Sequence, residues 1–176
     1  DDIPSDETYK ETHKTVHASE IHGKTFHIAA GEYQTANYIR MKFAQNTAAV
    51  KVTLKGGYDP DSKGTDLSKR DIANNVTELK GAIGASGGSK TMRVFLINQN
   101  VDLTLDGLSL TDGIGDGTYG EGEVFMDAAS STLNCLNCTF ANNTSPKNSG
   151  AIYVTAGSLA FTNCTFKNNK AFTEDG

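Results

Sequence analysis

A short motif near the end of the chain occurs twice and limits the fold more than any other feature. Residues 136–143 read Leu-Asn-Cys-Thr-Phe-Ala-Asn-Asn, and residues 162–169 read Thr-Asn-Cys-Thr-Phe-Lys-Asn-Asn. Cys138 therefore matches Cys164 at an offset of 26 residues. Residues 108–113 occupy the same place one unit earlier. Repeats of this length are typical of a solenoid, in which each unit is one turn of the chain.

A second apolar run precedes each copy of the motif. These runs lie at residues 94–97, 124–126 and 152–154, at offsets of 30 and 28 residues. Between them, residues 101–106 (Val-Asp-Leu-Thr-Leu-Asp) alternate apolar and polar side chains. Alternation with a period of two indicates strands with one buried face.

Units of about 28 residues with two or three short strands favour one architecture. We expect an all-β protein, a right-handed single-stranded parallel β-helix with an N-terminal cap. A leucine-rich repeat needs a fixed Leu/Asn template, which the chain lacks, and a propeller blade needs about 40 residues. The cap is assigned to residues 1–25, with a helical stretch near 6–20, and the coils to residues 26–176.

The repeat also predicts columns of identical side chains. Stacked turns place equivalent residues about 4.8 Å apart. Asparagine at a turn adopts the left-handed conformation, and its amide can bond the equivalent amide in the next turn. We expect these stacked residues to form structural ladders: Cys138, Phe140, Asn142 and Asn143 in one turn, and Cys164, Phe166, Asn168 and Asn169 in the next.

Strands are also expected in the first half, at residues 50–58 and 77–81. Residues 24–33 are interpreted as a strand followed by a turn.

Two segments of the repeat match known repeat motifs. Phe140-Ala141-Asn142-Asn143 and Phe166-Lys167-Asn168-Asn169 resemble the FxxN repeats of polymorphic outer membrane proteins, and residues 149–152 (Ser-Gly-Ala-Ile) resemble their companion GGAI motif. Residues 28–81 are similar to the opening coils of large secreted right-handed β-helix proteins with C-terminal surface anchors. The resemblance implies an exported adhesin, autotransporter passenger or surface-anchored protein, and it transfers no catalytic residue.

Composition and chain ends refine this expectation. A net charge of −5 argues against nucleic acid as a partner. No apolar run approaches the roughly 20 residues that span a bilayer. The chain begins with polar residues and no signal peptide, so the protein is either cytosolic or a form whose leader has been removed. The resemblance implies the second, with an extracellular or bacterial cell-surface location. Because the chain stops between coils, we expect it to be the N-terminal part of a longer β-helix, attached through a later C-terminal region.

One loop is a candidate cation site. Asp112, Asp116, Glu121 and Glu123 lie in a Gly-rich segment whose carboxylates and carbonyls could hold Ca²⁺. The alternative is a solvated loop, and no cofactor other than Ca²⁺ is expected. Residues 59–64 begin like a calcium loop, but Lys63 stands where a third acidic residue is needed, so a turn is the better interpretation.

Histidine and cysteine give weaker signals. His13 and His17, flanked by Glu11 and Glu20, would share one face of a helix as zinc ligands do, although ordinary solvated side chains in a cap explain them as well. Cys135 and Cys138 have CxxC spacing, but residues three apart in a strand face opposite sides. We expect free buried thiols, with a Cys138–Cys164 bridge as the alternative.

Two functions remain open. The first is a non-catalytic adhesin or structural stalk that binds a host or cell-surface protein or glycan. The second is a carbohydrate-active β-helix enzyme, a polysaccharide lyase or glycoside hydrolase, or a glycan-binding module. An enzyme would draw on outward carboxylates and a base at Lys90 or Arg93, whereas a groove that binds glycans without cleaving them would use tyrosines that stack on sugars, since the chain has no Trp. The carboxylates are Asp102, Asp106 and Asp127, and the tyrosines are Tyr33, Tyr38, Tyr58, Tyr119 and Tyr153.

Overall fold

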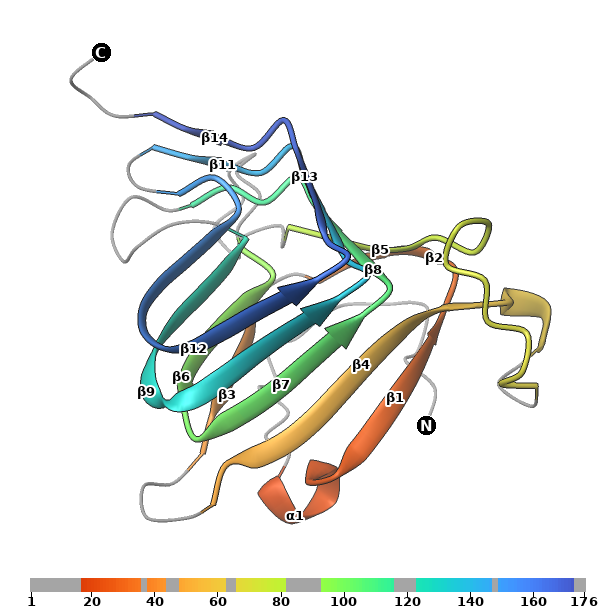
Figure 1. The fold of residues 1–176 in the computed structure, drawn as a ribbon, viewed down its shortest axis with the longest axis horizontal. Helices are drawn as coiled ribbons and strands as arrows, with labels where there is room; N and C mark the ends of the chain where they lie inside the picture. The colour runs from red at the N-terminus through yellow and green to blue at the C-terminus, as the bar shows by residue number, and fades with distance from the viewer. Residues whose placement is uncertain are drawn as a thin grey trace, which may run out of the picture.

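The computed structural model describes residues 17–35, 38–43, 48–62, 66–81, 93–115, 123–146 and 149–172. Over these residues the chain is a parallel β-solenoid of about four turns with little helix (Figure 1). The predicted single-stranded parallel β-helix is therefore confirmed. Every strand pairing between named strands is parallel, and each turn adds a strand beside the one before.

The first side of the solenoid is its longest ladder. It consists of β1 (Lys24–Ala29), β4 (Val50–Tyr58), β7 (Val101–Asp106) and the C-terminal parts of β9 (Val124–Leu136) and β12 (Ile152–Thr162). Val101, Leu103 and Leu105 are fully buried, whereas the residues between them are partly exposed or polar, so the alternation seen in the sequence does face one side inward.

The second side has shorter strands. It consists of β2 (Gly31–Gln34), β5 (Thr77–Lys80), β8 (Leu108–Thr111), β10 (Thr139–Ala141) and β13 (Thr165–Lys167). The turn expected at the end of residues 24–33 is instead β2, because Gly31–Gln34 pairs in register with Thr77–Lys80. Tertiary pairing here overrides a local turn signal.

The third side is formed by β3 (Ile39–Lys42), β6 (Phe95–Gln99) and the N-terminal parts of β9 and β12. The last two strands bend from the third side onto the first without a break (Figure 1). Phe95 pairs with Val124, so the offset of 30 residues predicted between the apolar runs at 94–97 and 124–126 is wrong by one residue. A two-stranded ladder, β11 (Thr144–Ser145) with β14 (Lys170–Ala171), follows the second side.

Left-handed residues make the corners. Between the first and second sides, Gly107, Asn137 and Asn163 have φ of 69°, 52° and 53°. After the second side, Asp112, Asn142 and Asn168 have φ of 58°, 58° and 55°. Glycine, asparagine and aspartate tolerate this conformation best, which explains the position of the asparagine pairs in the repeat.

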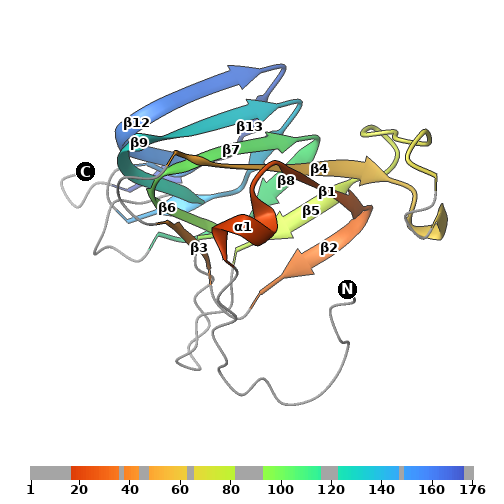
Figure 2. The ribbon, with the colours of Figure 1, turned by 90° about the horizontal axis from the view of Figure 1, so that it is seen from below.

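The helix α1 (Ala18–Ile21) lies at the β1 end of the stack, at the bottom of Figure 1 and facing the viewer in Figure 2. Its Ala18 and Ile21 pack against the hydrophobic core. The predicted helical stretch near 6–20 lies outside the described residues except for its last positions, and the cap assigned to residues 1–25 stays a prediction.

Candidate functional site

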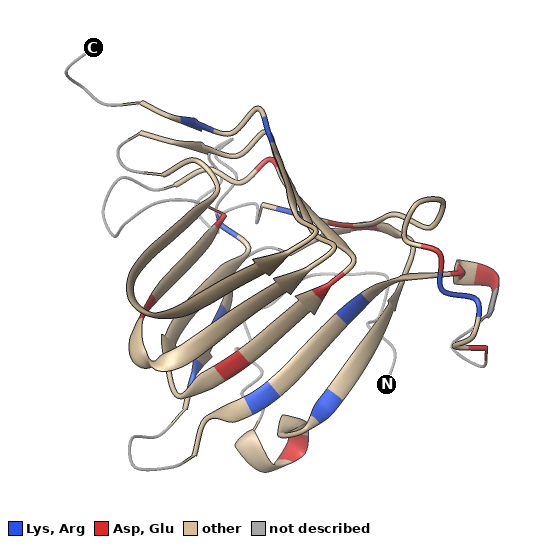
Figure 3. Ribbon diagram, viewed as in Figure 1, with Lys and Arg blue, Asp and Glu red and all other residues tan. Residues whose placement is uncertain are grey.

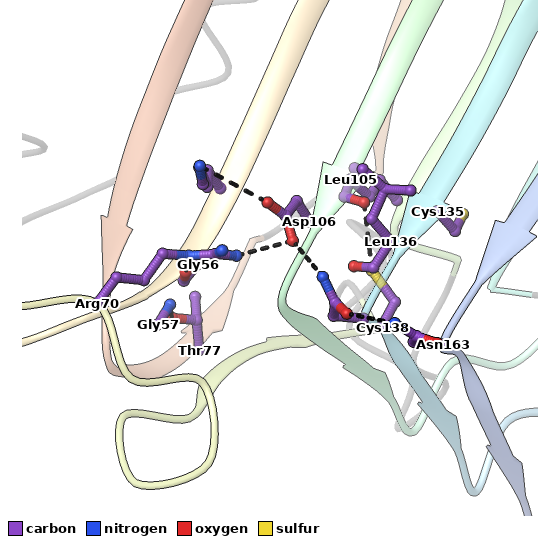
Figure 4. Close-up of polar contacts among 12 residues, drawn as sticks. Gly56, Gly57, Arg70, Thr77, Leu105, Asp106, Cys135, Leu136, Cys138 and Asn163 are labelled. Atoms are coloured by element: carbon purple, nitrogen blue, oxygen red, sulfur yellow. Dashed lines mark hydrogen bonds and ion pairs between the residues drawn. The ribbon is translucent and has the colours of Figure 1, made fainter.

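Asparagines at the outer corner between the first and second sides bond from turn to turn. The Asn163 side-chain Nδ2 donates to Oδ1 of Asn137 at 3.3 Å, and Asn137 Nδ2 donates to Oδ1 of Asp106 at 3.0 Å (Figure 4). At the next corner Asn168 Nδ2 donates to Asn142 Oδ1 at 3.3 Å. The amide ladder predicted at Asn142 and Asn168 therefore forms, and the sequence reading missed the one through Asn137.

The second asparagine of each pair behaves differently. Asn143 is fully buried; its Oδ1 accepts from the Gly113 backbone N–H at 2.9 Å and its Nδ2 donates to the Leu110 carbonyl at 3.1 Å. Asn169 repeats both bonds one turn later, to the Asn143 backbone N–H and the Phe140 carbonyl. The predicted amide-to-amide bond between Asn143 and Asn169 is therefore wrong, because the inward side chains bind the backbone of the preceding coil instead.

The predicted aromatic stack is present. Phe140 lies over Phe166 with ring centroids 4.9 Å apart and planes 11° from parallel. Phe161 meets both rings edge-on, at 6.2 and 5.1 Å.

The cysteines are free thiols that face the interior. Cys135 and Cys138 are both buried, so the expectation that they face opposite sides is wrong. The left-handed residue Asn137 turns the chain between them and points both thiols inward. Burial raises the pKa of Cys135, and it raises the pKa of Cys138 to about 11. Thiols held protonated in this way are poor nucleophiles and poor metal ligands.

An ion-pair network surrounds Asp106 on the outer corner (Figure 4). Arg70 Nη2 lies 2.8 Å from Asp106 Oδ1, and Lys55 Nζ lies 3.8 Å from Oδ2. Arg70 is anchored by its Nε, which donates to the Gly56 carbonyl at 2.8 Å. Burial alone would raise the pKa of Asp106, but the hydrogen bonds from Arg70 and Asn137 outweigh it and hold the pKa below its ordinary value.

The other outward carboxylates named as catalytic candidates also have hydrogen-bond partners. Asp102, which is opposite Lys51 in the register of the β4–β7 ladder, accepts a long hydrogen bond from Asn134 Nδ2 at 3.5 Å, and Asp127 accepts one from Thr155 Oγ1 at 3.0 Å. Figure 3 shows Lys on β4 beside acidic residues on the neighbouring strand β7, with a further Lys on β1 at the other edge of β4. Asp102 and Asp106 are four residues apart along one strand, which is about 13 Å. That separation exceeds the roughly 5–9.5 Å of a glycosidase carboxylate pair.

Glu123 is the described residue with the most unusual environment. Its side chain is fully buried, neither carboxylate oxygen has a hydrogen-bond partner, and Oε2 would lie 1.3 Å from a Cβ built on Gly113. Burial first, and the charge of Asp112 second, raise its pKa well above the ordinary value. A carboxylate in such a place is stable as the neutral acid or beside a cation.

The calcium prediction is only partly addressed by the described residues. Asp112 and Glu123 lie near one another at the turn after β8 and the start of β9. Asp116 and Glu121 lie outside the described residues. Within the part of the chain that is described, no group of three or more His, Cys, Asp or Glu side chains could hold a metal ion.

Three residues named from the sequence as sugar-binding or basic candidates gather beside β9. The Arg93 guanidinium lies 5.4 Å from the Phe125 ring centroid and 5.9 Å from that of Tyr38. Tyr153 stacks on Phe125 at 5.7 Å, with the planes 18° apart. We call Tyr38, Arg93, Phe125 and Tyr153 the aromatic patch. Phe125 and Arg93 are buried, whereas Tyr38 and Tyr153 are partly exposed.

The remaining candidates divide by position. His13, Glu11, Lys90 and Tyr119 lie outside the described residues, while Glu20 accepts a hydrogen bond from the His17 backbone N–H at 2.7 Å. Asp59 accepts from the Asp61 backbone N–H at 2.9 Å beside the short helix η1 (Pro60–Ser62), which is the turn expected there. Tyr33 donates to the Ala29 carbonyl, and Tyr58 stacks on His27.

Comparison of the chain with protein-family models, curated proteins and solved structures finds no match. Within the described ranges, no helix has the length and apolar character needed to cross a membrane.

Proposed function

We propose that this protein is a non-catalytic β-helix scaffold of the extracellular space or the bacterial cell surface, acting as an adhesin or structural stalk. The observation that supports it best is that the repeated asparagine side chains serve to hold one coil to the next. Asn142, Asn143, Asn168 and Asn169 all bond to the adjacent coil. A stalk requires repeated contacts that keep successive coils stacked in a rod. A catalytic site instead requires several functional side chains that converge on one point.

The outward carboxylates support the same proposal. Asp106 is held ionised by Arg70 and Asn137, and its pKa is lowered. A general acid needs the opposite shift, toward neutral pH. Asp102 lies about 13 Å away along the strand, too far for the paired chemistry of a glycosidase.

A glycan-binding module is the second candidate, and the aromatic patch favours it. Tyr153 and Tyr38 are partly exposed beside a stacked Phe125 and the Arg93 guanidinium. Aromatic faces offer a stacking surface to sugar rings. Arg93 and Phe125 are buried and support the two tyrosines from behind, Arg93 against Tyr38 and Phe125 against Tyr153. In this case the partner at the cell surface is a polysaccharide rather than a protein.

A glycan array combined with a lyase absorbance assay on the same panel tests these alternatives. The scaffold proposal predicts no product from any polysaccharide, and product formation would end it. Binding without turnover that is lost in Tyr153→Ala favours the glycan-binding module. Phe166→Ser is the matched control, because it removes an exposed aromatic ring of the last coil and leaves the patch intact.

A further inference from the structure

The outer face of the third side carries an apolar row that includes part of the aromatic patch. The strands β3, β6, β9 and β12 lie side by side here (Figure 1) and contribute one residue each, in register: Arg40, Leu96, Phe125 and Tyr153. The residues immediately before and after Phe125 are fully buried in the core, so the row points outward. Three of its four positions are apolar or aromatic, whereas the outward positions of β4 and β7 hold threonines and charged side chains.

Tyr38 extends this surface at the β3 end. It precedes Arg40 by two residues, which is about 7 Å along an extended chain. The Arg93 guanidinium contacts the Tyr38 ring as well as the Phe125 ring, which places Tyr38 on the same outer face as the row. Because Tyr38 and Tyr153 are both partly exposed, two tyrosine rings are open to a ligand near opposite ends of the row.

Arg40 differs from the other two arginines of the chain. Arg70 forms an ion pair with Asp106, and Arg93 is buried in the aromatic patch. Arg40 is exposed, and its Nε donates to Oδ1 of Asn98 on β6 at 2.9 Å. Among the described residues, no carboxylate forms an ion pair with Arg40. A neutral amide therefore orients the guanidinium, and its Nη1 and Nη2 groups can donate together to a carboxylate.

The charges on this face give a ligand its direction. Lys42 is exposed on the same strand as Arg40 and adds a second positive charge at the β3 end. Asp127 lies two residues after Phe125 on β9, and it accepts a hydrogen bond from Thr155 Oγ1. The face is thus positive at β3 and negative at β9, so an anionic ligand is favoured with its charge at Arg40.

The length of the row limits the size of the ligand. Arg40 and Tyr153 are separated by three strand-to-strand steps, which is about 14 Å at the usual spacing of parallel strands. One sugar ring is shorter than this distance. Only an oligosaccharide or polysaccharide that lies along the solenoid axis contacts both residues.

We propose that the outer face of the third side binds a uronic-acid polysaccharide. Arg40 donates two hydrogen bonds to a sugar carboxylate, and Tyr38 and Tyr153 stack on sugar rings of the same chain. The inference rests on the second candidate function, glycan binding, and adds the class of glycan and the residue that selects it.

Three polymers serve as probes for the full chain. Alginate has a carboxylate on every sugar, alginate methyl ester keeps the rings without the charge, and polyglutamate keeps the carboxylates without the rings. Binding is measured by calorimetry at low and high salt. At low salt we expect alginate to bind at least tenfold more tightly than either of the others, because it alone supplies both a carboxylate and a stacking surface. High salt should reduce this preference by screening the exposed charges.

Substitutions in the protein locate the carboxylate contact. Arg40→Gln is expected to weaken alginate binding about tenfold and to leave binding of the methyl ester unchanged, since the charge-assisted bidentate contact is lost. Lys51→Gln is the matched control, because it removes one positive charge from an exposed position on β4, on the first side. Circular dichroism and thermal melting check that both variants fold.

The outcomes distinguish this inference from glycan binding in general. A preference of the wild type for alginate over its ester that is lost in Arg40→Gln and kept in Lys51→Gln supports the proposal. Equal binding of alginate and its ester, equal loss in the two variants, or polyglutamate binding as tight as that of alginate overturns it. If alginate and its ester bind equally and Tyr153→Ala loses both, the uronate inference fails and the glycan-binding module stands. If no polysaccharide of the glycan array binds, both fail.

Discussion

Asp106 is the residue on which most outer-corner contacts converge. It joins Arg70, Lys55 and Asn137, and through Asn137 it begins the amide ladder of the later coils (Figure 4). Because Arg70 comes from the loop after β4 rather than from the repeat, this ion pair ties an irregular segment to the regular stack.

Replacing Asp106 by asparagine is expected to destabilise the fold by about 2 kcal/mol at neutral pH, since charge-assisted hydrogen bonds become neutral ones. The folded pKa of Asp106 is lowered, so its contribution is present above the unfolded pKa of about 3.9 and is lost as the pH falls through the folded value. Urea unfolding from pH 2 to 8 should show the wild type and variant converging in acid. Asp102→Asn, on the same strand, is the control; equal effects of the two variants would contradict a special role for Asp106.

Glu123 makes the stability of the fold depend on pH in the opposite direction from Asp106. Its folded pKa is raised, so the wild type should lose stability as the pH rises from the unfolded pKa of about 4.3 toward the folded value. Glu123→Gln should remove this slope and be more stable than the wild type at pH 8 without metal.

Calcium titration of the same pair tests the predicted cation site. If Ca²⁺ binds at Glu123, added calcium raises the wild-type melting temperature and leaves the glutamine variant unchanged. Glu32→Gln serves as control, since Glu32 is exposed and paired with Lys80. A glutamine variant less stable than the wild type at pH 8 in the presence of a chelator would contradict the assignment of Glu123 as a neutral buried acid.

At the scale of the elements, each coil is attached to the previous one by a small set of recurring contacts. Parallel ladders supply the backbone hydrogen bonds on all sides. At the corner after the second side, Asn143 and Asn169 hydrogen-bond the backbone of the preceding coil. The two asparagines of each pair therefore have separate roles: the first bonds to the ladder outside, and the second bonds to the backbone inside.

This division predicts unequal effects within one pair. Asn143→Ala should destabilise the fold by about 2–3 kcal/mol, because the Gly113 N–H and Leu110 carbonyl stay buried without their partner. Asn142→Gly keeps the left-handed corner and loses one exposed amide bond, so it should cost under about 1 kcal/mol. Thermal and urea unfolding measure both. Equal losses in the two variants would show that the inner and outer bonds are not distinct.

At the scale of the whole molecule, burial is uneven along the stack. The middle coils contain the fully buried residues, such as Leu103 and Leu133, whereas the last described coil exposes Leu159 in the same row. In a solenoid each coil is stabilised mainly by its neighbours, so a coil with one neighbour opens more readily.

Hydrogen exchange should follow this gradient. Backbone amides of β7 and of the C-terminal part of β9 are expected to exchange at least tenfold more slowly than those of β12 and β13. Mass spectrometry of peptic fragments measures the difference. Uniform protection along the chain would mean that the molecule opens only as a whole.

The sequence by itself determined the architecture and much of the register. Period-two alternation and a repeated motif suffice to predict a parallel solenoid, because only stacking of equal turns buries the apolar face of each one. The columns Phe140–Phe166 and Asn142–Asn168 follow from the same periodicity.

Other features were decided only by the tertiary structure. Cys135 and Cys138 both point inward because the chain turns a corner at Asn137 between them. The Glu123 side chain is buried against Gly113, where its carboxylate occupies the space that any larger residue at position 113 would fill. Arg70 reaches Asp106 from outside the repeat. Periodicity describes residues that repeat, whereas these contacts join residues without a counterpart in the next turn, so only the folded chain brings them together.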